Sequence, residues 1–234
     1  MVKQLDPPQR PLPRATRFRW SWAPRPDGAR WRWCRVYHRS THTPDGKTFR
    51  RFGPLYRLDH HHAAAPPQLD PHDRRVLYVG ADLATSASEV FGEAGIAAIC
   101  PRYRVSILAP TAPLPLLDLT KAGAAMAIGA LPTLADGNEP RALTQQWARA
   151  IFEDEPAGPT VRGVRYRTAY NFGHSIALWD CDDLVEIVRD KVGRAQDHAL
   201  DHPGIFNRFQ VEMRKRHIDV TTLPESNCPL CQRG

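Results

Sequence analysis

The sequence predicts an α+β fold, because short β-branched and aromatic runs recur along the chain while helical periodicity appears beside only some of them. Residues 76–92, VLYVGADLATSASEVFG, show both patterns in succession. Val76 to Val79 are typical of a buried strand, and Gly80 ends the run. Four apolar residues then lie on one helical face: Leu83, Ala87, Val90 and Phe91. A strand therefore passes directly into a helix at this corner.

Two polar residues make this corner a candidate functional site. Tyr78 lies near the end of the predicted strand, and Glu89 follows on the side of the helix away from the apolar stripe. Strand-to-helix corners in α+β folds often carry functional groups. A structural interpretation fits equally well, because Ser86 and Glu89 match a capping box in which the glutamate only satisfies backbone amides at a helix start. The local sequence leaves both interpretations open.

The bulk composition limits the class of protein. The chain has 234 residues and is 42% hydrophobic, which suits a soluble globular protein with a substantial core. We expect a cytoplasmic location and no membrane partner, since no apolar run approaches about 20 residues and no signal-peptide region is present. Five scattered cysteines argue against a disulfide scaffold. The net charge of +7 rests on arginine and fits nucleic acid, a nucleotide or an acidic protein.

Three segments are expected along the chain. Residues 1–30 form a proline- and arginine-rich arm, in which the prolines prevent a helix or a central strand. Trp20 and Trp22 are expected to pack the end of this arm on the main domain. Interleaved basic and aromatic residues also occur in single-stranded nucleic-acid platforms, so that interpretation stays open. The main domain is expected over 31–190, with a C-terminal helix and Cys-x-x-Cys tail over 191–234.

The remaining elements follow from the same two periodicities. Strands are predicted at 31–37, 103–108, 114–119, 164–168 and 175–179. A short alanine-rich helix is predicted at 121–128 and a longer helix at 143–152. Residues 184–189 fit a strand or a short helix, and the tail at 195–216 fits a helix.

Two groups of residues suggest metal binding, and each is incomplete in the sequence. The adjacent histidines at 60–62 point in different directions, so a solvated loop is the expected structure. Cys228 and Cys231 form a single Cys-x-x-Cys pair without a second pair. His217 is the only histidine near them in the sequence. We therefore predict no metal site.

An ordered series of motifs adds a family resemblance. The first motifs are Arg35-Val36-Tyr37, Phe52-Gly53-Pro54, Arg57-Leu58-Asp59, and VLYVG followed by Ala87-Ser88-Glu89. The later ones are Asp118-Leu119-Thr120, Thr144-Gln145-Gln146, Gly163 to Thr168, and Ala177-Leu178-Trp179. In this order, over about residues 33–180, the chain resembles the RES domain, the toxin half of RES–Xre toxin–antitoxin pairs.

The resemblance implies mixed, mainly antiparallel sheets with flanking helices, similar to ADP-ribosyltransferases. It also implies an enzyme that degrades NAD+ by breaking the nicotinamide–ribose bond with phosphate or water, or that passes ADP-ribose to a protein. The family's arginine, tyrosine and glutamate fall on Arg35, Tyr78 and Glu89, which we expect to be catalytic. NAD+ is then the substrate, phosphate is a co-substrate if it is the acceptor, and no metal or redox cofactor is expected.

Three further residues are expected to bind the substrate. The family's serine aligns with Thr168, which keeps the hydroxyl but adds a methyl group. Ser175, on the next strand, is the other available hydroxyl, and Arg57 is expected to contact a phosphate. In such a site Glu89 can stabilise an oxocarbenium-like state. The Tyr78 ring can stack on nicotinamide or adenine.

The resemblance also implies partners. An Xre-type helix-turn-helix antitoxin is expected to block the site, and nucleic acid is reached only through that antitoxin. The toxin is expected either to form a homodimer or to form complexes with the antitoxin. The competing hypothesis is a non-catalytic protein whose basic surface binds nucleic acid or an acidic partner in a salt-sensitive way. Release of nicotinamide from NAD+ separates these two hypotheses.

Overall fold

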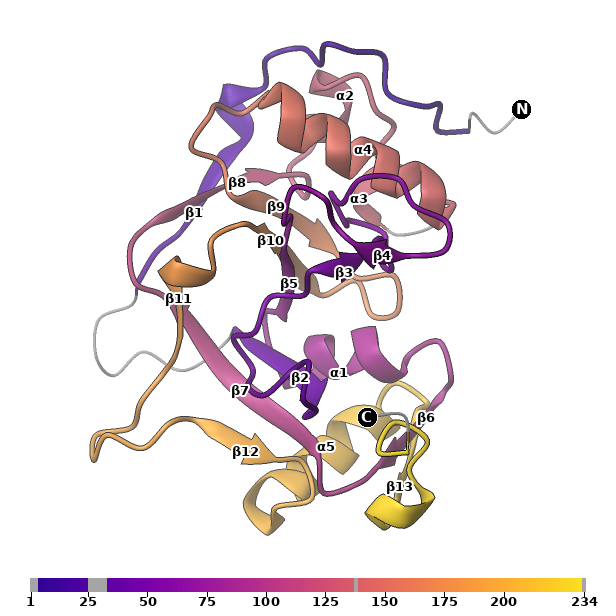
Figure 1. Cartoon of the computed structure of the whole chain (residues 1–234), viewed down its shortest axis with the longest axis vertical. Coiled ribbons are helices and arrows are strands. Elements are labelled where there is room, and N and C mark those ends of the chain that lie inside the picture. The colour runs from indigo at the N-terminus through magenta and orange to yellow at the C-terminus, as the bar shows by residue number, and fades with distance from the viewer. Residues whose placement is uncertain (1–3, 25–32, 137–138, 233–234) are drawn as a thin grey trace.

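The computed structural model describes residues 4–24, 33–136 and 139–232 (Figure 1). Its main sheet has nine strands, in the order β1-β8-β9-β10-β5-β2-β7-β11, and β12 also pairs with β7. These strands are β1 (Arg19–Trp22), β2 (Cys34–His38), β5 (Val76–Gly80), β7 (Tyr103–Pro110), β8 (Leu114–Asp118), β9 (Gly163–Arg167), β10 (His174–Trp179), β11 (Val185–Ile187) and β12 (Asp197–Ala199). Within this sheet β8 and β9 pair in parallel, and the other described pairs are antiparallel.

Two small sheets and the helices complete the described chain. The small sheets are the antiparallel pair β3 (Phe52–Gly53) and β4 (Gln68–Leu69), and the parallel pair β6 (Ile96–Ile99) and β13 (Asp219–Thr222). The α-helices are α1 (Leu83–Phe91), α2 (Ala124–Ala127), α3 (Thr133–Asp136), α4 (Arg141–Asp154) and α5 (Pro203–Arg214). The 3-10 turns are η1 (Thr16–Phe18), η2 (Asp182–Leu184) and η3 (Glu225–Asn227). The predicted α+β fold with a mixed, mainly antiparallel sheet is confirmed.

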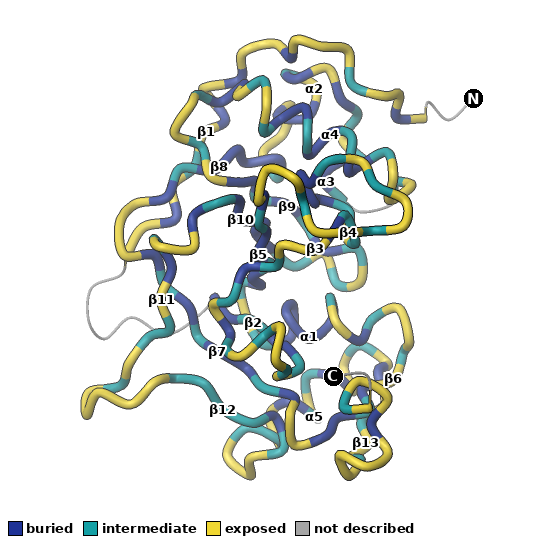
Figure 2. The backbone as a smooth tube through the Cα atoms, in the orientation of Figure 1, coloured by how far each residue is buried: buried dark blue, intermediate teal, exposed yellow. Residues whose placement is uncertain are grey.

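The core is divided by the main sheet, because alternate residues of a strand point to opposite faces. On β10, Ala177 and Trp179 belong to an apolar cluster that includes α4. Ile176 and Leu178 belong to a second cluster, which includes Trp22 of β1. A third cluster joins β2, α1 and α5. In Figure 1, α4 crosses the upper part of the molecule while α1 and α5 lie in the lower part, and Figure 2 shows buried segments in both parts.

The corner between β5 and α1 forms where it was predicted, but its cap differs. The Asp82 side chain caps α1 by accepting a hydrogen bond from the Thr85 N–H at 2.7 Å. Ser86 lies inside the helix, and its hydroxyl accepts from the Val36 N–H at 2.7 Å. The capping-box interpretation is therefore wrong. Glu89 lies in the last turns of α1, far from the amides that a cap satisfies.

The N-terminal arm packs on the domain. Leu5, Leu12 and Phe18 are buried in the cluster that includes α4. The arm then continues into β1 at the edge of the main sheet, where Trp22 is buried. Edge placement suits a segment flanked by prolines, because an edge strand needs only one row of backbone partners. Residues 25–32, which include the start of the strand predicted at 31–37, lie outside the described residues.

Several short elements differ from the predictions. β6, β12 and β13 have only three or four residues each, too few for a periodic signal. The tail helix begins at Pro203 instead of residue 195, with His202 as its N-cap. Residues 184–189 contain β11 after a 3-10 turn. None of the described helices is both long and apolar enough to span a membrane.

The expectation of a solvated loop is wrong for two of the three adjacent histidines, while His62 is partly exposed. His60 and His61 are fully buried. The His60 and His61 rings are neighbours, with centroids 5.7 Å apart, but His60 and His62 have different carboxylate partners. His60 Nε2 lies 3.1 Å from Asp180 Oδ2, and His62 Nδ1 lies 3.1 Å from a carboxylate oxygen of Asp70.

Candidate functional site

Three neighbouring strands bring a row of polar side chains together. Ser175 of β10 lies opposite Tyr166 of β9 and opposite Gly80 of β5. Tyr78 lies one row away on β5, opposite Ala177. Paired residues on antiparallel strands share a face of the sheet, so the two tyrosines and the serine face the same side. The Tyr78 and Tyr166 rings meet edge to face with centroids 6.5 Å apart.

Helix α1 brings the glutamate to this row, because the helix starts directly after β5. The Tyr166 hydroxyl donates to Glu89 Oε1 at 3.3 Å. Burial raises the pKa of Glu89, while the Arg57 guanidinium and the Tyr166 hydroxyl act in the opposite direction. Burial and the Glu89 carboxylate hold the pKa of Tyr166 well above its usual value. A glutamate so placed at the end of a strand-to-helix corner is a candidate catalytic group.

Arg57 provides the positive charge beside the glutamate. Its guanidinium carbon lies 5.2 Å from the centroid of the Tyr166 ring. One nitrogen, Nη2, donates to the Leu134 carbonyl oxygen at 3.0 Å. The buried Nε and Nη1 groups have no hydrogen-bond partner among the described residues. Buried donors of this kind are usually paired, so these two are available to an anionic ligand.

The hydroxyl of Tyr78 already makes two hydrogen bonds within the protein. It donates to Asp59 Oδ1 at 2.8 Å and accepts from the Leu58 N–H at 3.2 Å. Asp59 is fully buried and is held by Arg50 at 2.6 and 2.7 Å. Burial opposes ionisation of Asp59, yet Arg50 and two backbone amides keep its pKa below the usual value. Burial, together with the Asp59 carboxylate, raises the pKa of Tyr78. The ring of Tyr78 is thus held rigidly, and its hydroxyl remains protonated.

The two candidate hydroxyls differ in availability. Thr168 is buried, and its hydroxyl oxygen accepts from the Tyr170 N–H at 3.1 Å, in the turn between β9 and β10. Ser175 is also buried, but its hydroxyl has no hydrogen-bond partner among the described residues. The structure therefore leaves Ser175, and not Thr168, with free hydrogen-bonding capacity in the row.

Arg35 makes its described contacts elsewhere. Its Nη1 donates to the Thr48 carbonyl oxygen at 2.7 Å and to the Gly46 carbonyl oxygen at 3.2 Å, and its guanidinium lies over the Tyr37 ring. Burial lowers the pKa of Arg35 to about 10. This arginine braces the turn that follows β2 and has no described hydrogen bond to Tyr78 or to Glu89.

Of the six predicted residues, four therefore meet in one group. We call the group of Arg57, Tyr78, Glu89, Tyr166 and Ser175 the Tyr–Glu cluster. Tyr166 was missed, although the alternation of the predicted strand at 164–168 places Val164 and Tyr166 on one face. Arg57, Tyr78 and Glu89 remain partly exposed, so the cluster is not fully closed to solvent.

Two cavities lie away from this cluster. One lies at the C-terminal end of α4, between Phe152 and Trp179. The other is bounded by Leu119, Met126, Asp136 and Arg167 and has a volume of about 330 Å³. None of the six predicted site residues lines either cavity. The chemistry of the Tyr–Glu cluster, and not an enclosed volume, identifies it as the candidate site.

Comparison with known proteins gives one match. The model of the RES domain family matches residues 9–201 of this chain. No curated protein and no solved structure matches. The matched range contains every residue of the Tyr–Glu cluster, begins within the N-terminal arm and ends before α5.

Proposed function

The chain belongs to the RES domain family, and on that premise we propose that it is a toxin-type enzyme that degrades NAD+ by breaking the nicotinamide–ribose bond. The observation that carries the proposal is the environment of Glu89. This carboxylate is not a helix cap, and it lies beside Arg57 and the Tyr166 hydroxyl with its pKa raised by burial. A largely desolvated carboxylate next to a free cation is suited to stabilise charge that develops on a sugar.

The proposed reaction uses the carboxylate at the reacting carbon. The bond between ribose C1′ and the nicotinamide nitrogen breaks, and its electron pair leaves with neutral nicotinamide. The positive charge left on the ribose ring is stabilised by the ionised Glu89. Water or phosphate then attacks C1′. Water gives ADP-ribose and a proton, whereas phosphate gives ADP-ribose carrying a phosphate on that carbon.

Other residues of the Tyr–Glu cluster would hold the substrate. The unpartnered nitrogens of Arg57 suit the pyrophosphate, and the Ser175 hydroxyl suits a ribose or phosphate oxygen. The Tyr78 ring can pack against an aromatic ring of the substrate while its hydroxyl donates to Asp59. For Arg35 and Thr168 we propose supporting roles, since the first braces the turn at Gly46–Thr48 and the second shapes the turn between β9 and β10.

The proposal extends to partners. An Xre-type helix-turn-helix antitoxin would neutralise the enzyme by covering the exposed side of the Tyr–Glu cluster. Nucleic acid would then be contacted through the antitoxin, and a homodimer is the proposed assembly in the cytoplasm.

The experiment is to incubate the purified protein with NAD+, with and without phosphate, and to measure free nicotinamide. We expect release by the wild type and a loss of at least about 100-fold in Glu89→Gln, the typical cost of removing one group that stabilises developing charge. Glu93→Gln is the matched control, because Glu93 is exposed just beyond α1. Phosphate dependence of the product identifies the acceptor.

The result that overturns the proposal is a wild type that releases no nicotinamide under either condition. Strong, salt-sensitive binding to nucleic acid would then support the basic binding protein instead. The structure gives that alternative little support, because several arginines already have carboxylate partners. Examples are the pairs Arg50–Asp59, Arg104–Asp197 and Arg165–Asp118.

A further inference from the structure

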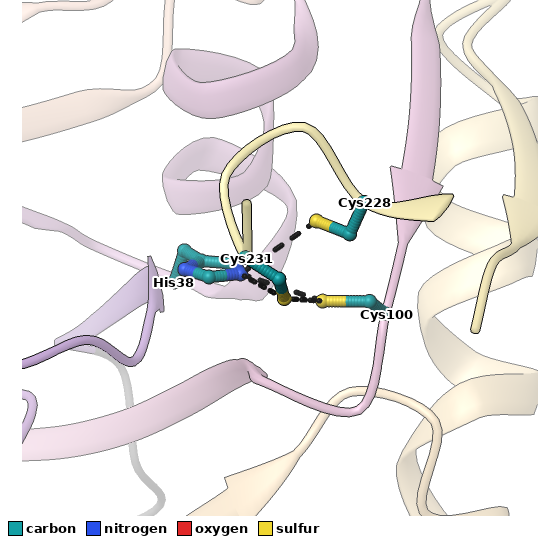
Figure 3. A group of neighbouring side chains, drawn as sticks. All are labelled: His38, Cys100, Cys228 and Cys231. Atoms are coloured by element: carbon teal, nitrogen blue, oxygen red, sulfur yellow. Dashed lines mark hydrogen bonds between the residues drawn. The ribbon is translucent and has the colours of Figure 1, made fainter. Parts of the chain in front are cut away.

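The C-terminal Cys-x-x-Cys pair meets two other metal-binding side chains in the lower part of the molecule. His38 ends β2, Cys100 directly follows β6, and Cys228 directly follows η3. Together with Cys231 they form a group whose ligand atoms all lie within 4.8 Å of one another (Figure 3). We call this group the Cys–His cluster. His217, the partner considered from the sequence, is not a member, and it lies exposed after α5.

The distances in the Cys–His cluster match a tetrahedral site. His38 Nε2 lies 3.3 Å from Cys231 Sγ, 3.4 Å from Cys100 Sγ and 3.7 Å from Cys228 Sγ. Cys100 Sγ and Cys231 Sγ are 3.6 Å apart. Zinc bonds of about 2.3 Å to sulfur and about 2.0 Å to nitrogen, at tetrahedral angles, place sulfurs about 3.8 Å apart and sulfur about 3.5 Å from nitrogen. All four atoms also point toward a common centre in Figure 3.

The surroundings suit thiolates. The backbone amides of Leu230 and Cys231 lie close to the Cys228 sulfur, and that of Arg102 lies close to the Cys100 sulfur. Donors of this kind orient metal-bound thiolates and spread their negative charge. Cys100 and Cys228 are almost completely buried. The His38 ring is held edge-on against Tyr103, with centroids 5.1 Å apart.

We propose that His38, Cys100, Cys228 and Cys231 bind one structural zinc ion. Three thiols and one imidazole fill all four positions of a tetrahedron, and a closed set of protein ligands is typical of a structural site, not a catalytic one. Binding releases the thiol protons to solvent and uses the unprotonated Nε2 of His38. No residue of the Tyr–Glu cluster is involved, so this proposal stands independently of the proposed enzyme activity.

The ion would fasten the end of the chain to the family domain. Cys228 and Cys231 lie beyond residue 201, where the family match ends, while His38 and Cys100 lie within it. The segment between them contains α5, which packs on α1, and β13, which pairs with β6. Zinc would therefore close a loop of more than a hundred residues, which restricts the unfolded chain and stabilises the fold.

The first test is the zinc content of the purified full-length protein, measured by elemental analysis. We expect one zinc per chain in the wild type, and Cys231→Ala and His38→Ala should weaken zinc binding by at least about 100-fold. Cys181→Ala is the control, because Cys181 is a free cysteine buried in a different apolar cluster. His38→Cys, which keeps four ligands, should retain the metal.

A second measurement covers the case in which a ligand variant fails to fold. Wild-type protein stripped with a chelator should melt at a lower temperature, and added Zn²⁺ but not Mg²⁺ should restore the melting temperature. Co²⁺ in place of zinc should give the visible bands of tetrahedral thiolate coordination. The proposal would be overturned if the wild type contained no zinc and its melting temperature changed with neither the chelator nor Zn²⁺. A Cys100–Cys231 disulfide in the native protein, or iron in place of zinc, would also overturn it.

Discussion

The Tyr–Glu cluster and the Cys–His cluster are both in contact with α1, yet they are built differently. Glu89 on α1 belongs to the first, while Ala87 and Phe91 pack in the apolar group that contains Cys100 and Cys228. In the first cluster the Glu89 carboxylate has Arg57 near it, and the Asp59 carboxylate that accepts from Tyr78 is paired with Arg50. In the second, three thiols and an imidazole converge.

This difference separates two kinds of organisation. In the Tyr–Glu cluster the negative charge of Glu89 is balanced by an arginine of the protein itself. The cluster also stays partly open to solvent, as the proposed substrate site must. The Cys–His cluster gathers soft ligands from positions up to 193 residues apart, and an external ion would complete it. The first cluster should therefore govern activity, and the second should govern stability. Each prediction below tests that division, from the largest expected effect to the smallest.

The largest effect is expected from Asp59→Asn, which tests the buried charge pair beside Tyr78. Asp59 is fully buried against Arg50, and removing one partner of a buried ion pair costs about 3–5 kcal/mol. Urea unfolding measures this cost. Asp73→Asn is the control, because that carboxylate pairs with Arg75 at the exposed surface and its loss should change stability little. Equal effects of the two changes would show that Asp59 is not a structural support of the Tyr–Glu cluster.

The division between the clusters is tested most directly by comparing Glu89→Gln with zinc removal. The folded-state pKa of Glu89 is raised, so its ionised form destabilises the protein increasingly as the pH rises through that pKa. At neutral pH, Glu89→Gln should therefore lose about 100-fold in nicotinamide release while its unfolding free energy is unchanged or higher. Chelation should instead lower the melting temperature. A glutamine variant that unfolds would contradict the division.

A smaller effect is expected from Tyr166→Phe, which removes the hydroxyl that donates to Glu89. A hydrogen bond to a charged group contributes about 1.5–3 kcal/mol, so release of nicotinamide should fall about tenfold or more. Because this donor lowers the pKa of Glu89, its loss should move the acid limb of the pH–rate profile to higher pH. Tyr37→Phe removes a comparable bond, to Asp197, and should leave the profile in place. An unshifted limb in Tyr166→Phe would contradict the assigned role of Glu89.

The smallest expected effect concerns the cap of α1. Asp82→Ala should cost about 1 kcal/mol of unfolding free energy, measured in urea, because the Thr85 N–H loses its acceptor. Asp82→Ser should restore most of this loss, since serine also caps helices well. The observed cap would be incorrect if the Thr85 N–H lost its acceptor in Ser86→Ala as well as in Asp82→Ala.

The parts of the fold that the sequence predicted are those with local signals. β5, α1, β9 and β10 follow from β-branched runs and apolar periodicity within a few residues of each other. The cap was missed because both Asp82 and Ser86 fit a helix start, and only packing against β2 engages Ser86. β6, β12 and β13 were missed because their pairing partners, not their own residues, define them.

The two clusters show the same limit. Tyr78 and Glu89 were predictable from one motif and the family resemblance, whereas the partners of Arg35 depend on how the turn after β2 folds back. His38 and Cys100 carried no metal-ligand spacing, so sequence proximity pointed to His217 instead. Long-range convergence of side chains is decided by topology, which local patterns do not contain.

The hydrogen bond from the Val36 N–H to the Ser86 hydroxyl has a mechanical consequence. Among the described residues, β2 pairs with β5 where Cys34 meets Gly80, and beyond that pair the Ser86 hydroxyl accepts the Val36 N–H in place of a strand partner. This hydrogen bond connects the helix that carries Glu89 to the strand that ends in His38. Loss of this bond would loosen the contact between α1 and β2, the two elements that carry Glu89 and His38.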